Sequence, residues 1–335
     1  MKENDHAYAV AGVDDLSGDA AVDALVSSLR RMRLDRPSRA VELPGHYASV
    51  IRLDDRTGLA MSTDTVGTKM LVAERLRRFD TIGIDCVAMN ANDVVCVGAE
   101  PIAMLDFVLC GEADPEVFEQ LGAGLARGAE LAGVEITGGE VAQVGEIVAG
   151  LELGGTCVGT VALAAIVDGS RIEPGDPVIG LPSSGLHSNG YTLARRVLAD
   201  VPLGDERLGR PLGDLLLEPT EIYVRAALDL LRSPVDVRGL AHITGGGIRN
   251  LLRLGDGVGF EIDDPLPVPP IFALISDLGS VSEDEMHEVF NMGCGFCCIV
   301  AANDEDAALD LLRRRYPGAK PIGRATDEAG TLKHH

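Results

Sequence analysis

The stretch Asp168-Gly-Ser-Arg-Ile-Glu-Pro-Gly-Asp-Pro177 divides this chain of 335 residues into two parts. It holds two glycines and two prolines within ten mostly polar residues, a composition typical of a connection between folded units. A chain of this length is long enough for two domains. We therefore expect a lead-in or lid over residues 1–47, an N-terminal domain over residues 48–168 and a C-terminal domain over residues 169–330.

The patterns on the two sides of this stretch differ. Before it, strand-like runs accompany two longer helices, and the second of these begins at Asp114-Pro115 with an acidic N-cap and a proline at the first helical position. After it, strands and helices alternate. We predict an α+β fold, with a mixed or antiparallel sheet in the N-terminal domain and a smaller α/β C-terminal domain. The expected strands are 49–53, 58–61, 102–109, 134–137, 146–152, 156–167, 178–181, 257–262, 295–301 and 320–324, and the expected helices are 20–32, 70–78, 80–97, 114–132, 190–200, 219–231, 282–290 and 304–314.

The charge of the chain is strongly negative. It has 52 acidic and 29 basic residues, a net charge of −23, and only four of the basic residues are lysines. Such a surface repels nucleic-acid phosphates and anionic lipid heads, so we expect neither nucleic acid nor membrane as a partner. No uninterrupted apolar run reaches the roughly 18 residues of a membrane-spanning helix. The acidic excess indicates a halophilic protein, since repulsion is screened within about 3 Å at 1 M salt. A GC-rich genome, the alternative, explains the arginines but not the charge.

The cysteines predict a cytoplasmic protein with reduced thiols. There are seven, an odd number, and the chain opens with Met-Lys-Glu-Asn-Asp rather than with a secretory leader. Cys294 and Cys297 form a CxxC pair within a strand-like run. Residues three apart in a strand point to opposite faces, so we expect these two thiols not to bind one metal and interpret them as core residues.

The segment Asp64-Thr-Val-Gly-Thr-Lys69 carries groups that suit a magnesium-bound polyphosphate. A strand delivers a carboxylate, a glycine permits close backbone approach, and Thr68 and Lys69 supply a hydroxyl and an ammonium. The segment is not a Walker loop, and a solvated turn before a capped helix is an equal alternative. Lys69 is the only lysine between Lys2 and Lys320. This favours a functional role, because the composition would otherwise supply Arg.

Three further acids stand in unusual positions. Asp93 lies within an apolar helix, Asp106 lies within an apolar strand, and Glu140 follows a Gly-Gly turn at the end of a strand. Buried acids are costly unless they are paired or bind a metal. Together with Asp64 they form a set of oxygen ligands of the kind that Mg²⁺ binds beside phosphates. For each acid alone, a helix cap or a surface position remains an open alternative.

Two polar loops in the second half are candidate anion sites. In the first, Pro182-Ser-Ser-Gly-Leu-His187-Ser-Asn-Gly-Tyr191, a helix N-terminus favours negative charge, and His187 can act as an acid, a base or a donor to an oxyanion. The second, His242-Ile-Thr-Gly-Gly-Gly247, is another candidate phosphate cradle. A packed histidine and ordinary glycine turns are the alternatives.

In order and over nearly the whole chain, these segments resemble the phosphoribosylformylglycinamidine cyclo-ligase family, the aminoimidazole ribonucleotide synthetases of purine biosynthesis. Each motif is modest alone, but the ordered set is highly specific. In the first half the motifs are Ala11-Gly-Val-Asp14, Thr63-Asp64, Val66-Gly-Thr-Lys69, Asp80-Thr-Ile-Gly-Ile-Asp85, Asn92-Asp93, Gly98-Ala-Glu-Pro101, Leu105-Asp106 and Gly138-Gly-Glu140. In the second half they are Ser183-Ser-Gly185, His187-Ser-Asn-Gly-Tyr191, Pro219-Thr220, Thr244-Gly-Gly-Gly247 and Phe290-Asn291.

The resemblance implies an ATP-dependent ligase that closes the imidazole ring of formylglycinamidine ribonucleotide and releases ADP and phosphate. It also implies Mg²⁺ as a cofactor and a homodimer formed through the N-terminal sheet, with ATP near the interface. The implied ATP-binding residues are Asp64, Thr68, Lys69, Asn92, Asp93, Asp106, Gly138, Gly139 and Glu140, and the implied metal ligands among them are Asp64, Asp93, Asp106 and Glu140. The implied substrate-binding residues are Ser184, Gly185, His187, Ser188, Asn189, Thr244, Gly245 and Gly246, and the implied catalytic residues are Asp93, His187 and Lys69.

Three departures limit what the resemblance carries over. Bacterial members have Gly-Gly-Phe-Gly where this chain has Pro44-Gly-His-Tyr-Ala48, which leaves the flexible lid in question. Val141 follows Glu140 where Thr is expected, and Thr65 follows Asp64 where Gly is expected. We favour an archaeal branch of the family over a paralogue with another substrate. Two other interpretations stay open: another ATP-using superfamily member, such as thiamine-monophosphate kinase or selenophosphate synthetase, and a non-catalytic nucleotide-binding subunit.

Overall fold

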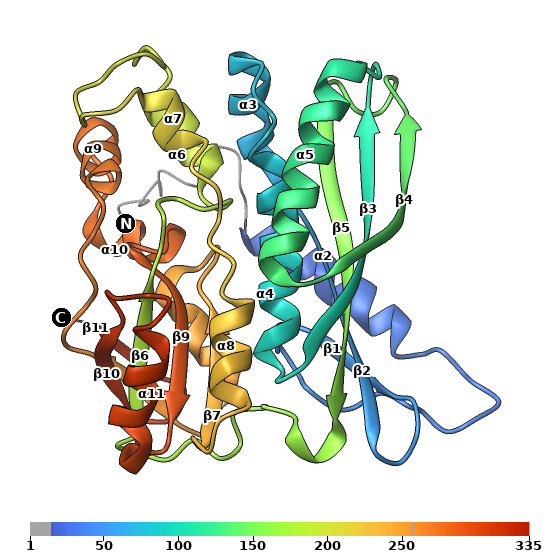
Figure 1. The fold of residues 1–335 in the computed structure, drawn as a ribbon, viewed down its shortest axis with the longest axis vertical. Helices are drawn as coiled ribbons and strands as arrows, with labels where there is room; N and C mark the ends of the chain where they lie inside the picture. The colour runs from blue at the N-terminus through green and yellow to red at the C-terminus, as the bar shows by residue number, and fades with distance from the viewer. Residues whose placement is uncertain (1–14, 256, 335) are drawn as a thin grey trace.

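The computed structural model describes residues 15–255 and 257–334 and contains two β-sheets. The N-terminal sheet stands on the right of Figure 1 and the C-terminal sheet on the left, with helices between and around them. The motif at residues 11–14 lies outside the described residues. Over the residues that are described, no helix is both long and apolar enough to cross a membrane.

The N-terminal sheet has five strands in the order β1-β2-β5-β3-β4. Among them β3 and β4 run parallel and the other neighbours run antiparallel, so the sheet is mixed, as predicted. The three strand-like runs expected between residues 134 and 167 are two strands, because residues 144–150 form a loop and β5 continues through two glycines. The strands are β1 (Ser49–Arg52), β2 (Thr57–Thr65), β3 (Glu100–Cys110), β4 (Glu135–Gln143) and β5 (Leu151–Ala162).

One face of this sheet is covered by two long helices, α4 (Ile82–Cys96) and α5 (Pro115–Ala132). The two helices lie so close together that a Cβ at Gly83 would overlap the backbone of α5, and glycine permits this approach. Asp114 caps α5 as predicted, accepting a hydrogen bond from the backbone N–H of Glu116 at 3.0 Å. The remaining elements of this half are α2 (Asp15–Leu29), α3 (Met70–Leu76) and the 3₁₀ turns η1 (Gly67–Lys69) and η2 (Leu163–Ala165).

The opposite face of the N-terminal sheet is exposed at its β3–β4 side. Leu105 on β3, which points to this face, is 51% exposed. The strand β4 is also the edge of the sheet and is exposed at seven of its nine positions. An exposed apolar sheet edge invites pairing with another chain.

The C-terminal sheet has six strands in the order β11-β8-β10-β6-β9-β7. The C-terminal sheet therefore has one strand more than the N-terminal sheet, so the expectation that this half is the smaller one is wrong in its number of strands. The sequence pattern did not predict the two short strands β7 and β11. The strands are β6 (Pro177–Pro182), β7 (Val237–His242), β8 (Gly259–Ile262), β9 (Cys294–Val300), β10 (Lys320–Thr326) and β11 (Leu332–His334).

The helices around the C-terminal sheet are short. The helix expected over residues 219–231 begins only at Val224, because residues 218–223 form a loop whose polar groups bond to the N-terminal half. The elements are α6 (Tyr191–Val197), α7 (Leu212–Leu216), α8 (Val224–Leu231), α9 (Pro270–Gly279), α10 (Glu283–Val289), α11 (Glu305–Leu312) and the 3₁₀ segments η3 (Gly247–Leu254) and η4 (Ala302–Asp304).

The seven cysteines are all free and buried, as the sequence predicts. The expectation that Cys294 and Cys297 point to opposite faces is wrong, since their Sγ atoms lie 3.5 Å apart. The pairing of β9 with β6 skips Gly295, and such a bulge adds one residue and changes the side-chain phase of the strand. In the described part of the chain, the pair has no third His, Cys, Asp or Glu close enough to complete a metal site.

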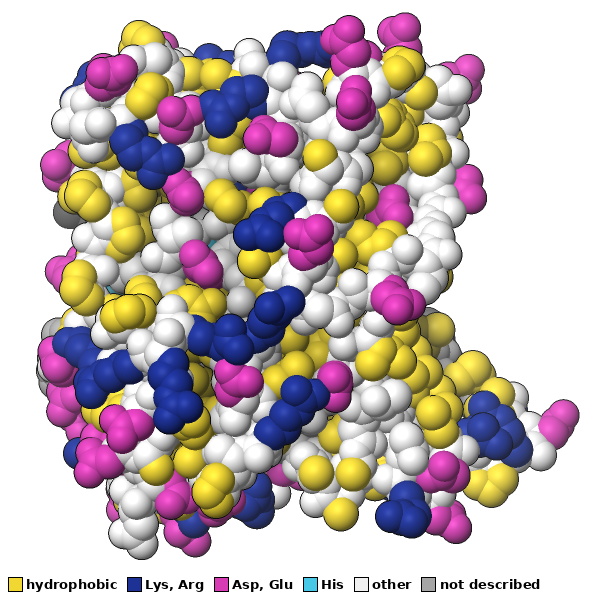
Figure 2. Space-filling view, in the orientation of Figure 1, with side chains coloured by type: hydrophobic (Ala, Val, Ile, Leu, Met, Phe, Trp, Pro, Cys, Tyr) yellow, Lys and Arg dark blue, Asp and Glu magenta, His cyan; other side chains and the backbone are white. Residues whose placement is uncertain are grey.

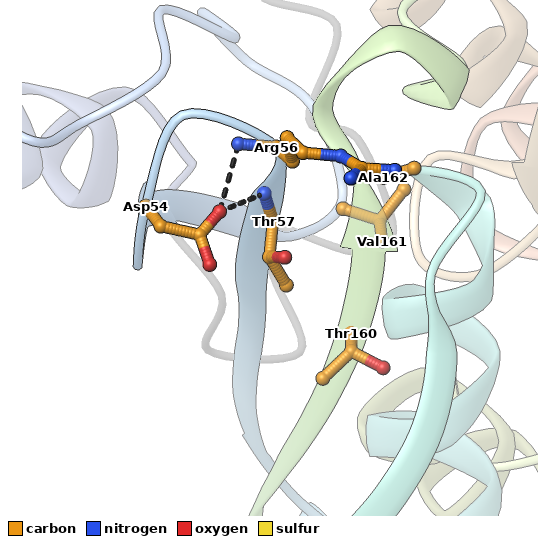
Figure 3. Close-up of a pocket in the computed structure, with 6 residues that line it drawn as sticks. All are labelled: Asp54, Arg56, Thr57, Thr160, Val161 and Ala162. Carbon is orange, nitrogen blue, oxygen red and sulfur yellow. Dashed lines mark hydrogen bonds between the residues drawn. The ribbon is translucent and has the colours of Figure 1, made fainter.

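An open hollow of about 410 Å³ lies where β2 and β5 meet the preceding turn (Figure 3). The Asp54 carboxylate there accepts hydrogen bonds from the backbone N–H groups of Arg56 and Thr57, both at 2.7 Å. This carboxylate therefore has a structural role in the turn. None of the predicted site residues lines this hollow.

Candidate active site

Lys69 carries a buried, fully hydrogen-bonded ammonium between the two sheets. It ends η1, is fully buried, and its Nζ lies 2.9 and 2.8 Å from the two carboxylate oxygens of Asp85 on α4. The ammonium also donates to the carbonyl oxygens of His187 at 3.0 Å and Glu218 at 2.6 Å. Burial lowers the pKa of Lys69, and Asp85 opposes that shift. The compact ammonium suits this three-sided set of acceptors better than the planar fork of an arginine would.

These contacts change the interpretation of Lys69. The sequence suggested contact with ATP phosphates, but all three N–H bonds of the ammonium are directed at protein oxygens. Asp85 in turn accepts from the N–H and hydroxyl of Thr220 at 2.7 and 2.6 Å. The Lys69–Asp85 pair therefore joins the N-terminal half to both polar loops, 183–191 and 218–223, of the C-terminal half. Asp85 belongs to the motif Asp80-Thr-Ile-Gly-Ile-Asp85, but no feature of the sequence pattern predicts its partner.

His187 is held in the loop that precedes α6, with a left-handed backbone at φ 63°. Its Nε2 accepts a hydrogen bond from the N–H of Ser184 at 3.2 Å, so Nδ1 carries the ring proton. Burial holds the pKa of His187 well below its usual value, so the ring is neutral. The buried Nδ1 has no partner among the described residues, and neither has the buried Nδ2 of Asn189. Two unsatisfied donors in one loop fit a ligand with acceptor oxygens.

The other predicted residues of this loop are bonded within the protein. The Ser184 hydroxyl donates to the carbonyl of Pro219 at 2.6 Å, and the hydroxyls of Ser188 and Thr220 lie 3.1 Å apart. The carbonyl of Gly185 accepts from Asn291 at 2.8 Å. These bonds fix the loop and leave His187 and Asn189 as the members with donors to spare.

Asp93 projects from α4 toward the C-terminal half, where its carboxylate lies 2.9 Å from Nδ1 of His242 at the end of β7. The ring of His242 is fully buried, whereas the Asp93 side chain is 13% exposed. Asn92 is buried and bonded to the backbone of residues 221 and 223, so it orients that loop rather than facing a cofactor. The sequence missed His242 as a partner because the short run that forms β7 contains Arg and Gly.

The four acids expected to hold a metal do not assemble in one chain. In the register of β3 with β4, Asp106 lies beside Gly139, and a Cβ at Gly139 would come 2.5 Å from its carboxylate. Glu140, the next residue, therefore points to the opposite face of the sheet. Among the residues that the structure describes, no three His, Cys, Asp or Glu side chains form a metal cluster. The expectation that Asp64, Asp93, Asp106 and Glu140 of one chain surround one metal ion is therefore corrected.

Asp64 keeps the features of a cation ligand. Its pKa is raised, chiefly by burial and further by the neighbouring charges of Asp93 and Glu152. Asn90 fixes its backbone, accepting from the Asp64 N–H at 2.9 Å. Burial likewise raises the pKa of Asp106 and of Glu152, whose carboxylate accepts from the N–H of Gly67 at 2.9 Å. Crowded acids suit a divalent cation, and Glu152 is a member of this group that the sequence did not reveal.

The glycine-rich turn at residues 244–246 lies beside the His187 loop. A Cβ at Gly245 would stand 3.4 Å from Oδ1 of Asn189. The hydroxyl of Thr68, in η1 of the N-terminal half, lies 3.3 Å from that of Thr192 on α6. The structure thus brings together Thr68, Lys69, His187, Asn189 and the turn, while Gly138, Gly139 and Glu140 lie on the far strand β4.

Comparisons with known proteins show the family of this chain. The model of the AIR synthase related protein N-terminal domain matches residues 45–161, and that of the C-terminal domain matches residues 173–335. A phosphoribosylformylglycinamidine cyclo-ligase from Methanothermobacter thermautotrophicus is 46% identical over 332 residues, covering 97% of this chain and 96% of the relative. One from Thermococcus gammatolerans is 46% identical over 329 residues, covering 96% of each.

Solved structures of lower identity share the fold. Hydrogenase maturation protein HypE in complex with ATP aligns with a TM-score of 0.62 at 22% identity, covering 85% of this chain and 84% of that one. Thiamine monophosphate kinase from Aquifex aeolicus aligns with a TM-score of 0.61 at 17% identity, covering 94% and 96%. These likenesses confirm the two-part α+β architecture. By its sequence identity over nearly its full length and by both domain matches, the chain belongs to the phosphoribosylformylglycinamidine cyclo-ligase family of AIR synthase related proteins.

Proposed function

We propose that this chain closes the imidazole ring of formylglycinamidine ribonucleotide at the expense of ATP, releasing aminoimidazole ribonucleotide, ADP and phosphate. The observation that supports this most directly is the pair of unsatisfied buried donors, His187 Nδ1 and Asn189 Nδ2, beside the glycine-rich turn. A ribonucleotide supplies acceptor oxygens on its phosphate, ribose and formyl amide. The family assignment supplies the reaction class.

In the proposed reaction, the γ-phosphoryl group of ATP passes to the formyl amide oxygen, an amidine nitrogen attacks the same carbon, and the oxygen leaves as phosphate. His187 acts as a donor and not as a base, because Nδ1 already carries the proton and the Nε2 lone pair is occupied by Ser184. Its Nδ1–H suits an oxygen on which negative charge develops. Lys69 acts on the reaction by fixing the His187 backbone, so it is a positioning residue in this proposal.

We propose that Asp64 and Asp93, with Asp106 and Glu152 near them, hold Mg²⁺ for ATP. When bound, the ion would neutralise phosphate charge and orient the nucleotide. Isothermal titration of the ATP-free protein with Mg²⁺ tests this, comparing wild type with Asp64→Asn. Loss of the binding heat in the variant supports the assignment, and equal heats contradict it.

We propose a homodimer through the exposed face of the N-terminal sheet, with residues 48–168 as the ATP-binding and dimerisation domain and residues 169–330 as the substrate-side domain. The exposed apolar side chain of Leu105 and the open edge of β4 support this. Glu140 points to the same face, so it would meet the partner subunit rather than the acids of its own chain. This placement offers a route by which Glu140 contributes to an ATP site at the interface.

We propose a cytoplasmic, halophilic enzyme. Seven free cysteines suit a reducing compartment. Acidic and basic side chains are interspersed over the face shown in Figure 2, and the whole chain still carries −23. Screening of this excess by KCl should raise the unfolding midpoint between about 0.1 and 1 M, where the Debye length falls from about 10 to 3 Å. A midpoint that does not rise would contradict the proposal.

The deciding experiment is an assay in about 1 M KCl, a salt level chosen for screening, with Mg-ATP and formylglycinamidine ribonucleotide. The imidazole product is detected by diazo coupling, and ADP is measured in parallel. One product per ADP, absent without the ribonucleotide, establishes the cyclo-ligase activity. ADP without imidazole would indicate another acceptor, as in a superfamily kinase or synthetase. Neither product, from folded protein, would favour a nucleotide-binding subunit.

A further inference from the structure

Residues 44–48 are bonded to the C-terminal half. Tyr47 is only 5% exposed, and its hydroxyl donates to the backbone carbonyl of Asn250 in η3 at 2.8 Å. The guanidinium of Arg253 lies 4.1 Å from the centre of the Tyr47 ring. Arg253 also donates to the carbonyls of Gly45 at 2.9 Å and His46 at 3.1 Å. These contacts fix residues 44–48, here called the clasp, on η3.

Asn250 connects the clasp to the glycine-rich turn. Its Oδ1 accepts from the backbone N–H of Thr244 at 2.8 Å, and its Nδ2 donates to the carbonyl of Gly245 at 3.2 Å. The next residues, Gly246 and Gly247, have φ of 97° and 55°. Glycine lowers the cost of these conformations but leaves the free backbone mobile, so the turn depends on an outside group to hold it. The Asn250 side chain, 8% exposed, is that group.

The position of this turn bears directly on the proposed substrate site. Gly245 packs against the amide of Asn189, whose Nδ2 is one of the two unsatisfied buried donors. A shift of the turn would therefore alter where Asn189 presents its N–H groups. Hydrogen bonds therefore join Tyr47 to Asn250 and Asn250 to the turn, and the turn itself lies against Asn189.

We propose that the clasp is a fixed support rather than a mobile lid, and that Tyr47 is a positioning residue that acts through Asn250 to hold the turn at residues 244–246 for the ribonucleotide. The identity of the ligand rests on the proposed function, whereas the role of Tyr47 in holding the turn does not. Tyr47 touches no reacting atom in this proposal. Its effect falls on binding of the ribonucleotide more than on ATP.

The test is Tyr47→Phe, which removes the hydroxyl and keeps the ring under Arg253. The matched control is Tyr316→Phe, which deletes another hydroxyl bonded to a backbone carbonyl, that of Ile222 at 3.2 Å. Hydrogen–deuterium exchange of the full-length protein should be faster over residues 242–250 in Tyr47→Phe, by about three- to tenfold for one lost hydrogen bond, and unchanged there in Tyr316→Phe. Unchanged exchange in Tyr47→Phe would overturn the proposal.

Steady-state kinetics provide the second measurement. Tyr47→Phe should raise KM for formylglycinamidine ribonucleotide by about three- to tenfold, with KM for ATP within about twofold, and Asn250→Ala should raise it further. An equal rise of both KM values, or a fall in kcat alone, would refute the assigned role. If wild type makes no imidazole, the proposed function fails, and exchange over residues 242–250 still decides whether the clasp supports the turn.

Discussion

Lys69→Met tests the central contact between the two halves of the molecule. The substitution keeps a long apolar stem and removes the ammonium that lies 2.8 to 2.9 Å from the Asp85 carboxylate. Neither side chain of the pair has any exposed surface. Asp85 would then remain as a buried carboxylate supported only by Thr220.

The expected loss of stability is large. Removing one partner of a buried ion pair costs about 3–5 kcal/mol, because the other charge stays desolvated. Lys69→Met with Asp85→Asn should cost less, about 1–2 kcal/mol, since an amide oxygen still accepts from Thr220 and no charge is left unpaired. The control is Lys320→Met, whose partner Asp264 is 70% exposed, and it should cost less than about 1 kcal/mol.

The assay is urea unfolding at a fixed KCl concentration, followed by far-ultraviolet circular dichroism because the chain has no Trp. A cost for Lys69→Met no greater than that for Lys320→Met would refute the argument from burial. So would a double variant that is less stable than Lys69→Met alone. A raised KM for ATP with unchanged stability would instead return Lys69 to the phosphate role that the sequence suggested.

Three other predictions follow from named contacts. Burial lowers the pKa of His46 from 6.5 to about 4, so between these pH values the unfolded chain binds a proton that the folded chain does not. The contribution of His46 to the free energy of unfolding is therefore fully present above pH 6.5 and falls as pH drops toward 4. In urea unfolding between pH 7 and 5, wild type should lose about 2 kcal/mol more than His46→Gln, and equal losses would contradict this. Asp93→Asn removes the charge that the proposed metal role requires, so kcat should fall by about 100-fold or more. The amide still accepts a hydrogen bond from His242, so the free energy of unfolding should change by no more than about 1 kcal/mol. A destabilised variant of normal kcat would rule out the metal role. Leu105→Glu should give monomers in light scattering, whereas Leu278→Glu, at a similarly exposed position on α9, should not; dimers in both would place the interface elsewhere.

The local elements were predictable because their signals are local. Asp114 and Pro115 at the start of α5, and Gly133 at its end with φ 76°, act through the backbone of their own neighbours. The mixed N-terminal sheet followed from strand-like runs of ordinary length. The strand β7 was missed because its arginine and glycine obscure the apolar run, and the pairing of His242 with Asp93 was missed with it.

The sequence by itself determined the order of motifs, the reaction class that they imply, and which residue types stand in polar loops. Only the tertiary structure decided their partners. It directed Lys69 to Asp85 instead of to phosphate, separated Glu140 from Asp106 through strand alternation, and brought Cys294 beside Cys297 through a bulge. The physical reason is that burial and register depend on chain segments far apart in the sequence. A lone motif therefore specifies a side chain but not the groups that will surround it.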